Sequence, residues 1–359
     1  MTARRQKVAV VTGGRSSEHE IALASARSVK QALDPARYDV VTVEIGRDGT
    51  WALEAGRDLP RLEQSSADVK GPGPLTGPPG TLPVPASSDG VMVALAEVDV
   101  VVPLLHGPFG EDGTVQGLLE LAGVPYVGAG VLGSALAMDK DRFKMMMRGA
   151  GVPVTRSVTR YPADPLEHPY AYPVFVKPAR LGSSVGITKV GSAPELEPAA
   201  ALAFRHDEKI LIEEFVDGIE VEVGVLGNRT PPPRASIPGE IVAHGFADTD
   251  WYDWSAKYDE GGMDLIVPPR IPADVSRRVQ DVAVAAFLAA ECEGMARVDC
   301  FVTRDGEVLV NELNTIPGFT ATSVYAKLFE ASGIAYGELL ERLIDLAIER
   351  HRRRSGLQF

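Results

Sequence analysis

The sequence predicts a protein of mixed α/β and α+β class with three domains: a doubly wound parallel sheet at the N-terminus, followed by two smaller α+β units. Length is the first reason, because 359 residues exceed one ordinary hydrophobic core. The second is pattern, since short apolar strands alternate with helical periodicity up to about residue 105 and paired strands follow. We place the domains at residues 1–128, 129–216 and 217–359.

The first domain is expected to contain three short apolar strands, at residues 7–12, 40–45 and 98–105. The first strand ends in Gly13 and Gly14 and leads into a helix that runs to about Leu33. Strand, glycine turn and helix in this order are typical of a doubly wound sheet. Residues 56–90 are rich in Gly, Pro and Ser, and we interpret them as an exposed insertion without chemistry.

The central domain is expected to contain a helix within residues 128–151 and three strands, at residues 174–177, 186–190 and 209–215. The third domain begins near Asp217 with a strand in which apolar side chains alternate with Glu220 and Glu222. It closes with a helix from about Tyr336 to Arg354, whose last arginines suit the negative end of the helix dipole.

A predicted hairpin near the C-terminus is the most informative segment. Side chains two apart in a strand share a face, so Arg297 and Asp299 point the same way. A turn at residues 304–306 then folds the chain back and brings Glu312 and Asn314 to the same place. Paired carboxylates repel unless a proton or a cation lies between them, and oxygen ligands suit magnesium or manganese better than zinc. We therefore predict a divalent cation site at Asp299, Glu312 and Asn314, with a solvated acidic hairpin face as the alternative.

Two features of the central domain are typical of a nucleotide site. The loop KPARLGSSVG at residues 177–186 has glycines and hydroxyls whose neighbouring amides can close over a polyphosphate, while Lys177 supplies charge. It lacks the Gly-Lys-Ser/Thr ending of a Walker-type loop, and a plain hairpin turn is the alternative. The strand at residues 211–216 carries acids that can bind an adenine amino group and ribose hydroxyls, unless they are simply solvated.

Two loops of the first domain follow strands, at the sheet edge where doubly wound folds bind ligands. Ser17 and Glu20 match a capping box for the first helix, which leaves Glu18 to face a ligand or to interact with the helix dipole. The loop at residues 106–113 also opens into a helix and should place His106 beside Glu18. A purely structural histidine is the alternative.

Residues 251–262 combine aromatic and polar side chains with a glycine pair, which is the composition of a mobile flap. Lys257 can meet a phosphate there, and Tyr258 can meet an active-site oxygen. A surface loop with incidental aromatic residues is the alternative.

Composition limits the location and the partners. The formal net charge of -13 argues against a nucleic-acid partner, because phosphate backbones require a basic surface. Cys292 and Cys300 are the two cysteines, which gives no disulfide framework and fits a reducing cytoplasm. The apolar run at residues 8–11 is too short for a signal peptide, and no segment approaches the length of a membrane span. We expect a cytoplasmic protein without a membrane partner.

Six motifs occur in one order along the chain: GGRSSEHE, LHGPFGEDG, MDK, KPARLGSSVG, WYDWSAKY, and RVDCFV with NELNTIPGFT. Together they closely resemble the D-alanine:D-alanine ligases of the ATP-grasp superfamily, over nearly the whole chain apart from the Gly/Pro-rich insertion. The resemblance implies a three-domain ATP-grasp architecture with the nucleotide bound between the two α+β domains, and a homodimer. It also implies ATP-dependent joining of two D-alanine molecules through an acyl phosphate, for the synthesis of peptidoglycan precursors.

The resemblance further assigns residues to roles. Residues that hold ATP would be Lys140, Lys177, Glu213, Glu214, Val216, Glu220 and Lys257. The ligands of two magnesium or manganese ions would be Asp299, Glu312 and Asn314, the same set that the hairpin argument reached. Residues that bind D-alanine or act in catalysis would be Glu18, His106, Ser183, Tyr258, Arg297, Gly318 and Ser323.

Individual roles follow from the same resemblance. Glu18, in a hydrogen-bonded set with Ser183 and Tyr258, would orient the ammonium group of the first D-alanine. Arg297 and the Gly318 amide would stabilise the tetrahedral oxyanion. The sequence departs from the family pattern at residue 22, where an alanine replaces a common serine, and we expect altered hydrogen bonds there without loss of activity.

Two other functions remain open. A ligase that joins D-alanine to D-lactate would keep the same ATP machinery, although Lys257 and Tyr258 favour an amine nucleophile. A nucleotide-binding sensor without catalysis is the second alternative.

Overall fold

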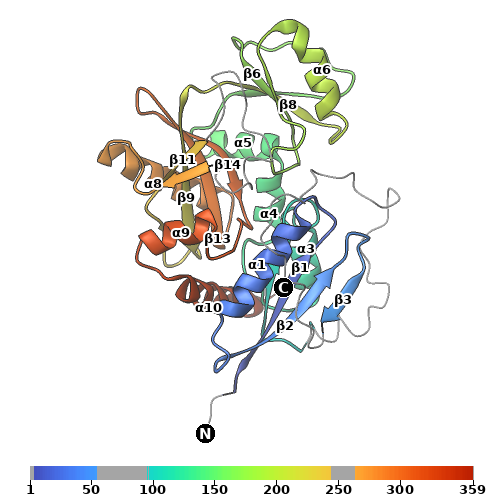
Figure 1. Ribbon diagram of the computed structural model, residues 1–359, viewed down its shortest axis with the longest axis vertical. Helices are drawn as coiled ribbons and strands as arrows, with labels where there is room; N and C mark the ends of the chain where they lie inside the picture. Colours follow the sequence, from blue (N-terminus) through green and yellow to red (C-terminus); the bar gives the residue numbers. More distant parts are fainter. Residues whose placement is uncertain (1–3, 55–94, 96, 244–262, 359) are drawn as a thin grey trace.

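The computed structural model describes residues 4–54, 95, 97–243 and 263–358, and three β-sheets organise this part of the chain (Figure 1). The predicted insertion at residues 56–90 and the predicted flap at residues 251–262 lie outside the described residues. Neither prediction is therefore tested.

The first sheet has the strand order β3-β2-β1-β4 and consists of β1 (Gln6–Gly13), β2 (Tyr38–Ile45), β3 (Trp51–Glu54) and β4 (Val100–Leu104). Strand β1 pairs in parallel with β2 and with β4, which confirms the predicted parallel sheet, and β3 adds an antiparallel edge. Alternate residues of β1 enter different cores: Val8 and Val10 face one side, and Ala9 and Val11 face the other. The sheet is therefore covered on both faces, as a parallel sheet requires.

Helix α1 (His19–Ala32) covers one face of this sheet, and α3 (Thr114–Leu121) packs into the core on the other face. The predicted capping box at the start of α1 is wrong. The helix begins at His19 with Glu18 as its N-cap, and no side chain caps it. The Ser16 hydroxyl accepts a bond from the Glu18 amide, and Glu20 forms an ion pair with Arg47 at 3.2 Å instead of reaching back to Ser17.

The second sheet has the order β5-β8-β6-β7 and consists of β5 (Ser157–Arg160), β6 (Val174–Pro178), β7 (Thr188–Val190) and β8 (Ile210–Glu214). All three pairings are antiparallel, and helix α6 (Ala193–Ala203) packs against one face. The loop between β6 and β7 is the predicted glycine- and serine-rich segment. Its backbone reverses at Ser183 and Ser184, whose φ angles of 54° and 56° lie in the left-handed region.

The single helix expected within residues 128–151 is two helices, α4 (Val131–Met138) and α5 (Lys140–Gly149). They separate at Asp139, whose ψ of 96° is extended and whose carboxylate accepts a bond from the Arg142 amide as the N-cap of α5. Both helices contribute to the core of the third sheet, where Phe143 and Met147 of α5 are buried.

The third sheet has the main order β12-β11-β9-β13-β14 and consists of β9 (Gly218–Gly227), β10 (Arg234–Ala235), β11 (Gly239–Ala243), β12 (Met263–Ile266), β13 (Gly294–Thr303) and β14 (Val308–Asn314). Helix α8 (Ala273–Ala289) packs against it. The predicted hairpin is confirmed, because β13 and β14 pair Arg297 with Asn314 and Asp299 with Glu312. The register therefore places the predicted cation ligands opposite one another.

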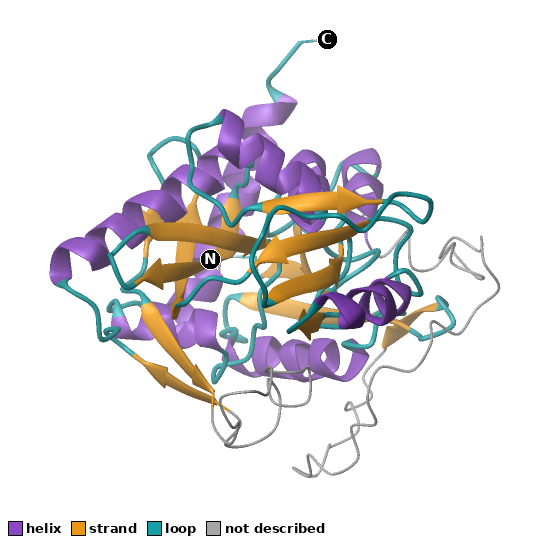
Figure 2. Ribbon diagram, turned by 90° about the horizontal axis from the view of Figure 1, so that it is seen from above, coloured by secondary structure: helices purple, strands orange, loops and turns teal. Residues whose placement is uncertain are grey.

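Helices α9 (Val324–Ala331) and α10 (Tyr336–Ser355) end the described chain, and α10 lies beside α1 (Figure 1). Leu339, Leu343 and Ile344 of α10 are at most 1% exposed and share one core with Val8 of β1 and Val100 of β4. The last helix thus completes the hydrophobic core on one face of the first sheet. Seen from above, the helices flank the strands (Figure 2).

Two further observations concern composition. Cys292 and Cys300 are buried and form no disulfide with each other, and burial raises the pKa of the Cys292 thiol to about 12. None of the helices that the structure describes is long and apolar enough to cross a membrane.

Candidate active site

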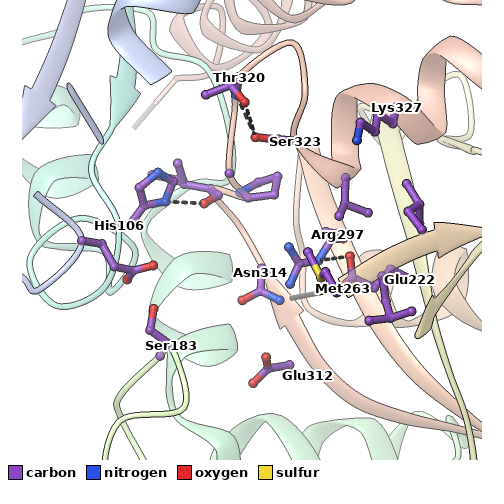
Figure 3. A pocket seen from close by; sticks show the side chains of 18 of the residues that line it. His106, Ser183, Glu222, Met263, Arg297, Glu312, Asn314, Thr320, Ser323 and Lys327 are labelled. Atoms are coloured by element: carbon purple, nitrogen blue, oxygen red, sulfur yellow. Dashed lines mark hydrogen bonds and ion pairs between the residues drawn. The ribbon is translucent and has the colours of Figure 1, made fainter. Parts of the chain in front are cut away.

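A cavity of about 330 Å³ is lined by residues from all three parts of the chain (Figure 3). Its walls come from the N-terminus of α1, the loop after β4, the β6–β7 loop, the β13–β14 hairpin and the segment that precedes α9. It brings together every predicted D-alanine or catalytic residue within the described chain: Glu18, His106, Ser183, Arg297, Gly318 and Ser323. Tyr258, the remaining member of that set, lies outside the described residues.

The hairpin holds Arg297 between two buried carboxylates. The Arg297 Nε and Nη2 atoms each donate to Asp299 at 2.7 Å, and Nε also lies 3.1 Å from Glu222 Oε2. Burial lowers the pKa of Arg297, but the charges of Asp299 and Glu222 outweigh burial and hold its pKa well above its usual value. The guanidinium therefore stays charged and fixed in the cavity wall. Glu222 was not among the predicted site residues, although it stands two positions after Glu220 on the same strand face.

The predicted cation ligands offer oxygen atoms only. Asn314 Nδ2 donates to Asp299 Oδ2 at 2.9 Å, which leaves the amide oxygen of Asn314 to face another partner. Asp299 accepts three bonds in all, and a carboxylate has about four acceptor positions, so one remains for a cation. Glu312 lines the cavity and lies 3.3 Å from Lys140 Nζ. Within the described ranges, no group of three His, Cys, Asp or Glu side chains forms a metal cluster, so the fit rests on the hard oxygen donors of this set.

The loop after β4 is tied to the loop after β14 by two side chains. His106 Nδ1 lies 2.9 Å from the Ile316 carbonyl oxygen, and Glu111 accepts bonds from the amides of Gly107 at 2.8 Å and Ile316 at 3.0 Å. Burial raises the pKa of Glu111 to about 7, with opposition from His106 and support from the nearby charge of Glu18. Glu111 was missed by the sequence argument, although it is the first acid of the LHGPFGEDG motif.

The segment before α9 forms the opposite wall. Ser323 Oγ accepts a bond from the Thr320 amide at 3.0 Å and lies 2.8 Å from the Thr320 hydroxyl. A Cβ atom on Gly318 would lie 3.3 Å from Ser323 Oγ, so glycine lets this backbone approach the hydroxyl closely. Figure 3 shows Ser323 and Lys327 on the wall formed by α9, with His106 and Ser183 across the cavity from Arg297. The wall therefore combines hydroxyls with the N-terminus of a helix, which suits a carboxylate ligand.

A second cavity of about 80 Å³ lies between the second and third sheets and shares Gly182, Ser183, Glu220 and Glu312 with the first. Apolar side chains such as Phe175, Ile187 and Phe301 form part of its wall, which suits a purine ring. It brings together every predicted ATP residue within the described chain: Lys140, Lys177, Glu213, Glu214, Val216 and Glu220. Lys257 lies outside the described residues.

The charged groups of this second cavity have defined partners. Lys140 Nζ donates to the Leu181 carbonyl oxygen at 2.9 Å, which connects it to the β6–β7 loop. Glu214 turns its carboxylate to Arg156, whose Nε donates to it at 2.7 Å, so a contact of Glu214 with a nucleotide would use its backbone. Glu213 contacts Lys177 at 2.5 Å and also Lys144, a lysine that the sequence argument did not name.

Comparisons with known proteins place the chain in one family of enzymes. A family model described as D-ala D-ala ligase N-terminus matches residues 7–129, and one described as D-ala D-ala ligase C-terminus matches residues 148–345. The D-alanine–D-alanine ligase of Streptomyces avermitilis is 44% identical over an alignment 379 residues long, gaps included. The alignment covers 99% of this chain and 96% of the relative.

Two solved structures have the same fold. The D-alanine-D-alanine ligase from Coxiella burnetii superposes with a TM-score of 0.76 at 34% identity, and the match covers 98% of this chain and 97% of the other. The VanG D-Ala:D-Ser ligase from Enterococcus faecalis superposes with a TM-score of 0.79 at 36% identity, covering 96% of this chain and 100% of the other.

Proposed function

Because the chain belongs to the D-alanine–D-alanine ligase family, we propose that it is an ATP-dependent ligase that joins two D-alanine molecules into D-alanyl-D-alanine for peptidoglycan precursors. One observation carries the proposal to this chain. The cavity that gathers the predicted substrate residues adjoins the cavity that gathers the predicted ATP residues, and Glu312 lines both. A phosphoryl group and a substrate carboxylate can therefore meet beside Glu312.

The adenine of ATP would occupy the smaller cavity between the apolar side chains, and its phosphates would extend past Lys140 and Lys177 toward the larger cavity. The backbone at Glu214 and Val216 would meet the adenine, and Glu220 would meet the ribose. Two lysines on one side of a polyphosphate offset its charge, which is the main requirement of phosphoryl transfer. Lys257 would join them at the terminal phosphate.

Asp299, Glu312 and Asn314 would hold two magnesium or manganese ions, a set of oxygen donors that such hard cations prefer. Bound there, divalent cations supply positive charge to the transferring phosphoryl group. Lys140, which lies 3.3 Å from Glu312, would contact the same phosphate directly.

The first D-alanine would lie with its ammonium toward Glu18, which is 8% exposed at the cavity wall. Its carboxylate is a poor electrophile until phosphorylation turns one oxygen into a leaving group, so an acyl phosphate forms first. Tyr258 and Ser183 would help to close this side of the cavity. Exclusion of water matters here because water hydrolyses an acyl phosphate.

The second D-alanine would lie with its carboxylate toward Ser323 and the N-terminus of α9. Its amine, once deprotonated, attacks the acyl carbon, and phosphate leaves to give the dipeptide. Arg297 and the Gly318 amide would stabilise the oxyanion of the tetrahedral intermediate. Asp299 and Glu222 hold Arg297 for this task, since Asp299 accepts from Nε and Nη2 and Glu222 lies 3.1 Å from Nε.

A D-amino acid assay tests the function. We expect ADP release that depends on D-alanine, with D-alanyl-D-alanine identified by mass spectrometry. D-Lactate and D-serine should be offered as acceptors over a series of pH values, because VanG is a D-Ala:D-Ser ligase. Preferential formation of a depsipeptide or of D-alanyl-D-serine at neutral pH would reverse the assignment of the acceptor. ATP binding without any D-alanine-dependent hydrolysis would identify a sensor instead.

The cellular setting that we propose follows from the same activity, since a peptidoglycan precursor is assembled from small soluble molecules. We propose a cytoplasmic homodimer. Sedimentation velocity at several protein concentrations measures its mass directly, and a monomer at every concentration would remove the dimer from the proposal.

A further inference from the structure

A buried carboxylate of β8 lies between two lysines from different elements. Glu213 Oε1 is 2.5 Å from Lys177 Nζ of β6, and Glu213 Oε2 is 2.6 Å from Lys144 Nζ of α5. The side chains of Glu213 and Lys144 are 2% and 1% exposed, and that of Lys177 is 8% exposed. Each carboxylate oxygen therefore has a lysine of its own.

The two lysines do not play the same part. Lys177 and Glu213 line the smaller cavity, whereas Lys144 is absent from its lining residues. The Lys144 ammonium also contacts the hydroxyl of Thr155, which is fully buried. Lys144 is thus placed behind Glu213 and reaches the cavity only through that carboxylate.

Charge balance gives this arrangement a function. A buried carboxylate with one lysine forms a neutral pair, and the pair attracts an anion weakly. Burial lowers the pKa of Lys144 to about 8, with opposition from Glu213, so at neutral pH most molecules keep this lysine charged. The three groups then carry a net positive charge, and Lys177 can hold Glu213 and still attract a phosphate. Burial would raise the pKa of Glu213, but Lys144 and Lys177 lower its pKa to about 2, so the carboxylate is ionised at neutral pH.

We propose that Lys144 is a positioning residue for the nucleotide: it holds one oxygen of Glu213, and Glu213 in turn presents the Lys177 ammonium to the phosphates. The inference rests on the proposed function, because it takes ATP as the ligand of the smaller cavity. It differs from the roles given above, since Lys144 touches neither substrate.

The test compares nucleotide binding with D-alanine binding in Lys144→Met. We expect the Kd for the magnesium complex of ADP, measured by isothermal titration calorimetry, to rise by about tenfold or more, as loss of a buried charge partner does. The KM for D-alanine should change by less than about twofold, because Lys144 is proposed to affect the binding of the nucleotide and not the binding of D-alanine. Unchanged affinity for ADP in a folded variant overturns the proposal.

A matched control lies outside both cavities. Glu293 is 7% exposed and contacts Arg353 with one oxygen and Arg354 with the other, so Arg353→Met also removes one of two cations from a buried carboxylate. We expect this control to lose thermal stability and to keep the ADP affinity of the wild type. An equal loss of ADP affinity in the control would mean that Lys144 acts through general stability, which contradicts the proposal.

A double variant tests whether Lys144 acts through Glu213. In a Glu213→Gln background there is no carboxylate to balance, so Lys144→Met should change ADP affinity by less than about threefold. An equal loss of ADP affinity in both backgrounds contradicts the proposed route.

If Lys144→Met does not fold, Thr155→Val replaces it. That change removes the hydroxyl contact of Lys144, and ADP affinity should fall by about two- to fivefold. No change in that variant also overturns the proposal.

The two proposals fail in different ways. If the wild type binds ADP but makes no dipeptide, the proposed function is wrong while the effect of Lys144→Met on ADP can still be measured. If the wild type makes the dipeptide and Lys144→Met binds ADP normally, the role of Lys144 is wrong and the function stands.

Discussion

Acidic side chains in the two cavities differ in the partner that each one has. Asp299 is held by Arg297, Glu312 lies against Lys140, and Glu213 lies between Lys144 and Lys177. Glu111 differs from them because it accepts hydrogen bonds from the backbone amides of Gly107 and Ile316, and its nearby charges include the carboxylate of Glu18. Burial, with the nearby charge of Glu18, therefore raises the pKa of Glu111 to about 7 and opposes its ionisation.

The pH dependence of stability tests this point. The pKa of Glu111 rises from 4.5 to about 7 in the folded protein, so between these values the native state keeps a proton that the unfolded state has lost. The free energy of unfolding should therefore fall as the pH rises through this window and level off above it. Because the side chain is partly buried, we expect a contribution of about 1–3 kcal/mol.

Urea unfolding of the wild type and of Glu111→Gln at about pH 5 and about pH 8 measures the effect. The wild type should lose stability relative to the variant between the two pH values, since glutamine does not titrate. A constant difference between the two proteins would show that Glu111 is ionised at both pH values.

Residue-level prediction from the sequence succeeded where the signal is local. The pairing of Asp299 with Glu312 follows from strand alternation and a glycine-containing turn, and the structure has that register. Glu213 and Lys144 lie in different elements far apart in the chain, and no local pattern predicts that contact. The capping box failed because α1 starts at His19, after the Ser16 hydroxyl has taken the amide of Glu18.

At the scale of elements, the break between α4 and α5 positions Lys140 at the first turn of α5. Asp139 accepts the Arg142 amide at 3.1 Å and also the ammonium of Lys209 at 2.6 Å. One carboxylate therefore caps a helix and neutralises a lysine that is 4% exposed. The residue that follows it, Lys140, enters the smaller cavity.

Two substitutions at Asp139 separate these tasks. Asp139→Asn keeps a capping side chain and loses the ion pair with Lys209, so we expect a loss of about 1–2 kcal/mol in the free energy of unfolding. Asp139→Ala loses the cap as well and should cost about 1 kcal/mol more. Chemical denaturation of both variants gives the two values, and equal stability of Asn and Ala variants would contradict capping.

Helices and strands were predictable from the sequence where a segment is long enough for its apolar pattern to repeat several times. Apolar runs with a glycine turn predicted the parallel strands β1, β2 and β4, and alternation predicted β9. The short edge strands β3, β10 and β12 have two to four residues each, which is too short for a period to appear. Whether such a short segment forms a strand depends on the strand that it pairs with, and the sequence of the segment alone does not show that partner.

At the scale of the whole molecule, α10 packs against elements of both the first and the third sheet. Arg350 of α10 is 3% exposed, and its guanidinium donates to the carbonyl oxygens of Tyr126 and Gly128. It also lies over the Tyr126 ring at 4.2 Å from the centroid. This contact and the shared core around it hold α10 against the first sheet and the segment that follows it.

Arg350→Ala should therefore lower the free energy of unfolding by about 2–3 kcal/mol, because two charged hydrogen bonds and a cation–π contact are lost. Arg352→Ala serves as the control, since Arg352 is exposed on the same helix and should change stability by less than about 0.5 kcal/mol. Thermal unfolding followed by circular dichroism compares them. A similar loss in both variants would assign the effect to the helix and not to the contact.

The sharing of one core by β1 and α10 also constrains how the polypeptide is made. During translation β1 and α1 leave the ribosome first, whereas the part of the core around Val8 and Val10 that α10 supplies is added only when residues 336–355 have been made. Later segments such as the β13–β14 hairpin can assemble in the meantime. We therefore expect the packing of this face of the N-terminal sheet to be completed only after α10 has been made.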